Sequence, residues 1–120
     1  MNLYNKNLVV TMTITEEEMR KCKCEVSPAK KRMIRPEMAR EKADYLKVLA
    51  NPTRIQILNL LSEKDLCVCV LSEAMGKSQP NISQHLTKLK DNDIIESYGK
   101  GKLAFYRIKD RRVKQILERI

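Results

Sequence analysis

The sequence predicts a mainly α-helical fold that carries one small β-hairpin (α+β), and three observations predict it. Apolar residues recur at helical spacing through most of residues 36–91. Two later segments, 94–98 and 103–108, are rich in β-branched and aromatic residues and flank Gly99-Lys100-Gly101-Lys102, which is typical of a hairpin turn. A last apolar stripe follows Asp110. With 120 residues, the chain has room for one domain with a modest core.

The first two helices are marked by prolines at their starts. Pro36 suits the first turn of a helix whose apolar side is formed by Met38, Ala39, Ala43, Leu46, Leu49 and Ala50. Asn51 is expected to cap the second helix, with Pro52 at its first position. The buried side of that helix should hold Ile55, Ile57, Leu58 and Leu61.

The third and fourth helices are short and closely spaced. Asp65 can cap the third, which runs through Met75 and so includes Cys67 and Cys69, and Gly76 can close it in a left-handed conformation. Ser78 can cap the fourth, whose inner stripe consists of Ile82, Leu86 and Leu89. Two short helices joined at a glycine and followed by a basic hairpin predict a winged helix-turn-helix.

The last helix opens at Asp110 and carries Val113, Ile116, Leu117 and Ile120 on one side. Few other residues of the domain remain to pack against this stripe or against that of the first helix. Isolated helices of such length are only marginally stable in water. A homodimer interface is the favoured use of both stripes, with packing on the chain's own core as the alternative.

Residues 1–35 are predicted to be a basic N-terminal extension, and residues 36–120 the winged helix-turn-helix domain. Glu16-Glu17-Glu18 is expected to open a short helical turn. The stretch 20–35 has seven basic residues, one acid and no apolar periodicity, so we expect a flexible or partner-ordered arm there. No apolar run is long enough to span a bilayer and no secretory signal is visible, which favours a cytoplasmic protein that does not enter membranes.

The net charge of +9 points to a polyanionic partner, although a merely basic or membrane-surface protein would share it. The outer side of the fourth helix has short amides and hydroxyls that suit the major groove of DNA, with a solvated polar face as the alternative. The candidate DNA-binding residues are Ser78, Gln79, Asn81, Ser83, Gln84, Thr87 and Lys88 on this helix, and Lys100 and Lys102 at the hairpin tip. His85 is expected to be a packed, hydrogen-bonded residue or a phosphate contact rather than a metal ligand.

All four cysteines form two Cys-x-Cys pairs, Cys22/Cys24 in the basic arm and Cys67/Cys69 in the third helix. A helix N-terminus and nearby lysines favour the thiolate that binds metal. Residues two apart do not face each other on a regular helix, so either that turn loosens to let Cys67 and Cys69 bind one ion, or Cys69 alone binds it while Cys67 meets another partner. Four thiolates suit Cd(II), Pb(II) or Zn(II), and three suit As(III). Burial as small core residues is the alternative for Cys67 and Cys69.

The stretches Leu66–Leu71 and Ser78–Leu86, with Leu49–Ile55 upstream and the hairpin Tyr98–Arg107, resemble the ArsR/SmtB family of metal-sensing repressors over about residues 38–118. The resemblance implies a homodimer, joined through its first and last helices, that represses its promoter when metal-free and leaves DNA when its inducer binds. It matches Cys67 and Cys69 to the family's third-helix metal box, which arm cysteines complete in cadmium- and lead-sensing members.

Three departures from the family pattern are visible. Ser72 stands where arsenic sensors with this box often have a third cysteine, so arsenic would need an arm cysteine. Val70 replaces the acid that usually follows the box. Asp110 is followed by Arg111 and Arg112 without a histidine, which argues against a zinc site on the last helix.

The leading interpretation is a metal-responsive repressor of operator DNA. A thiol redox sensor of the same fold is the first alternative, and an architectural DNA-binding protein with structural zinc is the second. An enzyme is not expected, because no nucleophile–base pair, phosphate-binding loop or paired catalytic carboxylates can be recognised.

Overall fold

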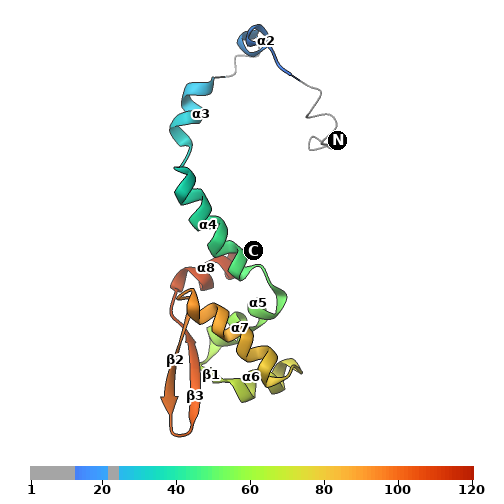
Figure 1. Cartoon of the computed structure of the whole chain (residues 1–120), viewed down its shortest axis with the longest axis vertical. Helices are drawn as coiled ribbons and strands as arrows, with labels where there is room; N and C mark the ends of the chain where they lie inside the picture. Colours follow the sequence, from blue (N-terminus) through green and yellow to red (C-terminus); the bar gives the residue numbers. More distant parts are fainter. Residues whose placement is uncertain (1–12, 22–24) are drawn as a thin grey trace. The chain divides into compact units, whose positions relative to one another are not determined.

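The computed structural model describes residues 13–21 and 25–120 (Figure 1). The chain divides into two units, Met1–Arg35 and Pro36–Ile120. The first unit contains α2 (Glu16–Lys21) and α3 (Val26–Arg32). The helical turn expected at 16–18 is confirmed, and it has a capping box: the Thr15 amide donates to Glu18 Oε2 (2.9 Å) and the Glu18 amide to Thr15 Oγ1 (3.2 Å).

Helix α3 lies where the sequence analysis expected no helix. Its proline, Pro28, falls in the first turn, where a missing amide hydrogen breaks no helical bond. None of its residues is buried, so its seven residues form a helix without the apolar stripe on which the prediction relied.

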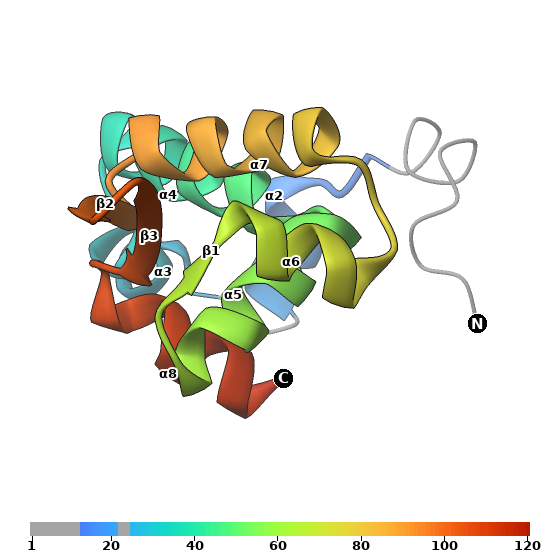
Figure 2. The ribbon, with the colours of Figure 1, turned by 90° about the horizontal axis from the view of Figure 1, so that it is seen from below.

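The second unit confirms the predicted class, mainly helical with a small antiparallel sheet (Figures 1 and 2). Its elements in chain order are α4 (Pro36–Leu49), α5 (Pro52–Glu63), β1 (Leu66–Cys67), α6 (Val68–Met75), α7 (Gln79–Asp91), β2 (Ile95–Lys100), β3 (Leu103–Ile108) and α8 (Arg111–Arg119). No helix in the described ranges has the length and apolar character that crossing a membrane requires.

The helix boundaries follow local side-chain chemistry. Asn51 Oδ1 accepts from the Arg54 amide (3.1 Å). Asp110 Oδ1 accepts from the Arg112 amide (3.0 Å). Gly76 ends α6 with φ of +62°, in the left-handed region that favours glycine. These predicted caps are confirmed.

The sheet has the strand order β1-β3-β2, and β1 is a strand that the sequence analysis did not predict. Leu66 pairs with Tyr106 and Cys67 with Phe105. The third helix therefore begins at Val68, so the prediction that Asp65 caps it is wrong. The Asp65 carboxylate instead accepts a hydrogen bond from the Tyr98 hydroxyl (2.6 Å), which ties the residue before β1 to the hairpin.

The core is formed by residues of α4, α5, α6, α7, β2 and α8, together with Ile94, which precedes β2. Its buried residues are Val48, Leu49, Ile57, Leu58, Leu61, Leu71, Ile82, Leu86, Leu89, Ile94, Ile95 and Val113. Ile55 was predicted to be buried, but it is 39% exposed because the inner side of α5 is centred on Ile57, Leu58 and Leu61. Ile120 was placed on the inner side of α8, but it follows the end of that helix and is 90% exposed.

Candidate functional site

Helix α7 presents one buried and one exposed side. Its predicted inner stripe, Ile82, Leu86 and Leu89, is buried. All the candidate DNA-binding residues of this helix and its cap are exposed: Ser78, Gln79, Asn81, Ser83, Gln84, Thr87 and Lys88. Figure 2 shows α7 along one side of the domain, with α6 beside its N-terminal end and the hairpin near its C-terminal end. A row of short amides and hydroxyls on a fixed helix is an arrangement that can enter the major groove.

The start of α7 is suited to a phosphate. Ser78 Oγ accepts from the Asn81 amide (3.2 Å), which leaves the serine's own hydroxyl hydrogen available as a donor. Pro80 occupies the first turn. Because proline has no amide hydrogen and the Asn81 amide is already bonded, the first turn offers an anion the Gln79 amide and the Ser78 hydroxyl.

The hairpin forms the wing and is stiffened by side-chain contacts along it. The rings of Tyr98 and Phe105 stack with centroids 5.9 Å apart. Arg107 lies 5.0 Å from the Tyr98 ring centroid and donates to Glu96 Oε1 at 2.8 Å, and this bond raises the pKa of its guanidinium. Lys100 and Lys102 are exposed near the tip, so their charges are available to a phosphate backbone.

Side-chain hydrogen bonds join α7 to β2 and to α5. Lys90 Nζ donates to Ser97 Oγ on β2 (2.9 Å). Arg54 of α5 donates from Nε to His85 Nδ1 (3.3 Å) and from an Nη to the Val48 carbonyl (3.0 Å). The pKa of His85 is lowered, first by burial and then by the nearby charges of Arg54 and Lys77. The expected packed, hydrogen-bonded histidine is confirmed, but its arginine partner was missed because it lies on another helix.

The two cysteines of the second pair occupy different elements. Cys67 is 5% exposed, lies in β1 and is the N-cap residue of α6. Cys69 is exposed in the first turn of α6. The prediction that both lie on one helix is therefore wrong for Cys67, because its backbone is extended and pairs with β3. Cys22 and Cys24 lie outside the described residues.

The exposed thiol contacts the start of α7. Gln79 Nε2 donates a hydrogen bond to Cys69 Sγ (3.8 Å). Within residues 13–21 and 25–120, no group of three or more histidine, cysteine, aspartate or glutamate side chains could hold a metal ion. The sulfur atoms of Cys67 and Cys69 are soft donors of the kind that thiophilic ions prefer.

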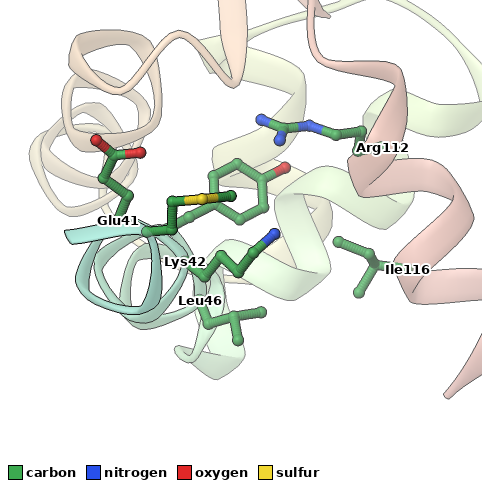
Figure 3. A pocket seen from close by; sticks show the side chains of 7 residues that line it. Glu41, Lys42, Leu46, Arg112 and Ile116 are labelled. Atoms are coloured by element: carbon green, nitrogen blue, oxygen red, sulfur yellow. The ribbon is translucent and has the colours of Figure 1, made fainter. Parts of the chain in front are cut away.

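A groove of about 460 Å³ lies between α4 and α8 (Figure 3). It is lined by Met38, Glu41, Lys42, Tyr45, Leu46, Arg112 and Ile116. The Tyr45 hydroxyl donates to Asp110 Oδ2 (3.0 Å), and Arg112 lies 4.6 Å from the Tyr45 ring centroid. Burial, followed by this bond, raises the pKa of Tyr45 to about 12.

Residues 51–97 match the family model described as bacterial regulatory protein, arsR family. An uncharacterized HTH-type transcriptional regulator of Methanocaldococcus jannaschii is 42% identical over 77 residues, which are 63% of this chain and 86% of that protein. The arsenical resistance operon repressor of Staphylococcus aureus is 32% identical over 68% of this chain and 78% of its own length. A homolog of the cadmium resistance regulatory protein CadC, also from S. aureus, is 37% identical over 64% of each chain.

A solved structure has the same fold. It is the homodimeric winged helix-turn-helix DNA-binding domain of a possible ArsR-family regulator from Mycobacterium bovis, with a TM-score of 0.62 and 29% identity. The alignment covers 68% of this chain and 76% of that one. The chain therefore belongs to the arsR family of bacterial regulatory proteins and is a DNA-binding transcriptional repressor with a winged helix-turn-helix domain, a class of proteins that are not enzymes.

Proposed function

We propose that this repressor is released from its operator when a soft metal or metalloid ion binds the thiolates of Cys67 and Cys69. One observation carries the proposal. Cys67 belongs to β1, which pairs with the wing strand β3, whereas Cys69 contacts the first residue of α7. An ion held by both sulfurs would act at once on the two elements that are candidates for DNA contact.

Because Cys67 is buried, ion binding is coupled to a change in conformation, and a switch requires such coupling. Its side chain packs inside while that of Cys69 faces solvent, so a single ion can bind both only after the start of α6 rearranges. The ion would then favour a conformation other than the described one. Such a difference in affinity between two conformations is what allows an effector to change DNA binding.

The arm is proposed to complete the ion's coordination. Residues 1–35 would form a basic extension that brings Cys22 and Cys24 to the Cys67/Cys69 pair of the domain formed by residues 36–120. Four thiolates favour Cd(II), Pb(II) or Zn(II), and As(III) would take three of them. The names of relatives concerned with cadmium and arsenical resistance support this range of ions.

The proposed complex is a homodimer on double-stranded operator DNA in the cytoplasm. The M. bovis domain is homodimeric, and the groove between α4 and α8 leaves apolar side chains open for a second copy. In this complex α7 would read bases and Lys100 and Lys102 would contact phosphates. Paired half-sites then match the two-fold symmetry of the protein.

The test is a titration of reduced protein against DNA from its own promoter, followed by fluorescence anisotropy without oxygen. Cd(II), Pb(II), Zn(II) and As(III) are added in turn, to the wild type and to the Cys67→Ser, Cys69→Ser and Val70→Ser variants. We expect one ion to weaken DNA binding at least tenfold in the wild type and in the Val70→Ser control, whose exposed position neighbours Cys69, and not in either cysteine variant.

Other outcomes separate the alternatives. Loss of binding with a mild oxidant but with no ion would indicate a redox sensor. Unchanged binding under every condition would leave a repressor whose thiols switch nothing. If the ion still weakens DNA binding in the Cys22→Ser and Cys24→Ser variants, the arm cysteines do not belong to the metal site.

A further inference from the structure

We propose that the Cys69 thiol acts on DNA recognition through Gln79, a base-reading side chain of α7 whose direction the thiol sets. The inference rests on the proposed function and adds a route for the regulation. Gln79 is the first residue of α7, and its side-chain amide donates to Cys69 Sγ at 3.8 Å, within the range for a sulfur acceptor.

The bond joins two elements that the chain connects by a tight turn. Cys69 and Gln79 are ten residues apart, and α6 ends at Gly76 between them. Both side chains are exposed, so the bond lies at the surface where an ion and a DNA duplex would approach. In the part of the chain that the structure describes, Gln79 is the candidate DNA-binding residue whose side chain bonds to a thiol.

The chemistry of the amide explains how a thiol can orient a base-reading side chain. A glutamine amide has two N–H donors and one carbonyl acceptor. One N–H donates to the sulfur, which leaves the other N–H and Oε1 on the opposite edge. That pair matches the N7 acceptor and N6 donor of adenine. Cys69 therefore fixes the direction in which the reading edge of Gln79 points.

Ion binding removes this orientation. The ion takes a lone pair of Cys69 Sγ, and sharing it with the buried Cys67 requires the Cys69 sulfur to move. The amide of Gln79 then either follows the sulfur or loses its acceptor. In both cases the free N–H and Oε1 of Gln79 leave the position in which they can bond to adenine.

A matched pair of glutamines on the same helix tests the inference. Gln79→Leu and Gln84→Leu each remove an exposed amide from the proposed reading side, but Gln84 has no bond to sulfur among the described contacts. The measured quantity is the ratio of DNA dissociation constants with and without the active ion. We expect both variants to bind DNA more weakly than the wild type when no ion is present. Only Gln79→Leu should also lower the ratio of dissociation constants. The decrease should be about threefold to tenfold, which corresponds to the energy of one hydrogen bond.

The outcomes distinguish this inference from the proposed function. A wild type whose ratio stays at one for every ion refutes the proposed function, and the inference falls with it. A responsive wild type with an unchanged ratio in Gln79→Leu overturns the inference alone. An equal drop in both variants overturns it too, because the effect would then belong to the whole reading side.

Nuclear magnetic resonance of the ¹⁵N-labelled wild type makes the test independent of how well the variants fold. The side-chain amide signals of Gln79 should shift when the ion is added, and those of Gln84 should shift much less. Unmoved Gln79 signals in a protein that releases DNA would overturn the inference.

Discussion

Helices α4 and α7 are similar in length and amphipathic character, but the domain treats them differently. The inner stripe of α7 is buried along its length, through Ile82, Leu86 and Leu89. Helix α4 buries only Val48 and Leu49 near its end and leaves Leu46 52% exposed. The contrast teaches that an apolar stripe predicts which side of a helix will be buried. It does not predict whether the same chain or another molecule buries that side.

The difference arises from the neighbours of each helix. α7 packs against α5, α6 and β2 of its own chain. The apolar side of α4 borders the groove that it forms with α8 (Figure 3). Its own domain thus holds α7 in place, as the proposed reading of DNA requires, while α4 leaves apolar surface open to the proposed second copy.

The largest expected effect is on the stability of the domain. Leu86→Ala should lower the free energy of unfolding by about 2–5 kcal/mol, because it empties a fully enclosed site in the core. Urea unfolding followed by circular dichroism measures it, with the exposed neighbour Thr87→Ala as control, expected to change stability by about 0.5 kcal/mol or less. Equal losses in the two variants would contradict the contrast between the sides of α7.

The next effect is on self-association rather than folding. Leu46→Glu should weaken the proposed dimer at least tenfold, because it places a charge in the open groove, and should leave the monomer folded. Sedimentation velocity measures the association. Lys47→Glu is the control, since it makes a larger change in charge at a neighbouring position outside the lining of the groove. Undiminished association in Leu46→Glu would show that α4 is not covered by a second copy.

A smaller effect concerns the polar attachment of α4 to α8. Tyr45→Phe removes the bond to Asp110 and should lower stability by about 0.5–1.5 kcal/mol at pH 7. The pKa of Tyr45 is raised to about 12, so its contribution is complete below pH 10 and is lost as the pH rises from 10 towards 12. Between pH 8 and 12, the free energy of unfolding should decline more steeply for the wild type than for Tyr45→Phe. Parallel curves for the two proteins would contradict this.

The smallest effect is the pH dependence of α7's attachment. The pKa of His85 is lowered, so the unfolded chain binds its proton more readily and stability should fall as the pH drops below about 6.5. Protonation removes the acceptor for Arg54 and adds a cation beside it. His85→Gln should flatten the curve of melting temperature between pH 7 and 5. A slope equal to that of the wild type would exclude this histidine as the cause.

Most of the fold could be predicted from local signals. Asn51, Ser78 and Asp110 act within one helical turn, and Gly76 and the hairpin turn act through the backbone itself. These effects involve residues near in sequence, so composition and spacing reveal them. Strand β1 was missed because two residues show no alternation, and its partner β3 lies about forty residues later in the printed sequence.

The candidate site was predictable in its residue types but not in its connections. The positions of the paired cysteines and of the polar side of α7 can be read from their spacing. The bonds Gln79–Cys69, Arg54–His85 and Tyr98–Asp65 join different elements, and no periodicity predicts which side chains meet. The placement of Cys67 in a strand was not predictable from spacing, and it keeps the two thiols apart in another way, because Cys67 is buried while Cys69 is exposed.

The enclosure of Cys67 also has a consequence for timing. Under the proposed chemistry, an ion can bind the exposed Cys69 at once, but it reaches the buried sulfur of Cys67 only after the start of α6 rearranges. When the ion is in excess, the rate of this conformational step then sets the delay before the protein leaves its operator, and the ion concentration does not. An ion that dissociates from Cys69 before this rearrangement would leave the repressor on its operator, so transcription would respond to sustained exposure and not to a brief one.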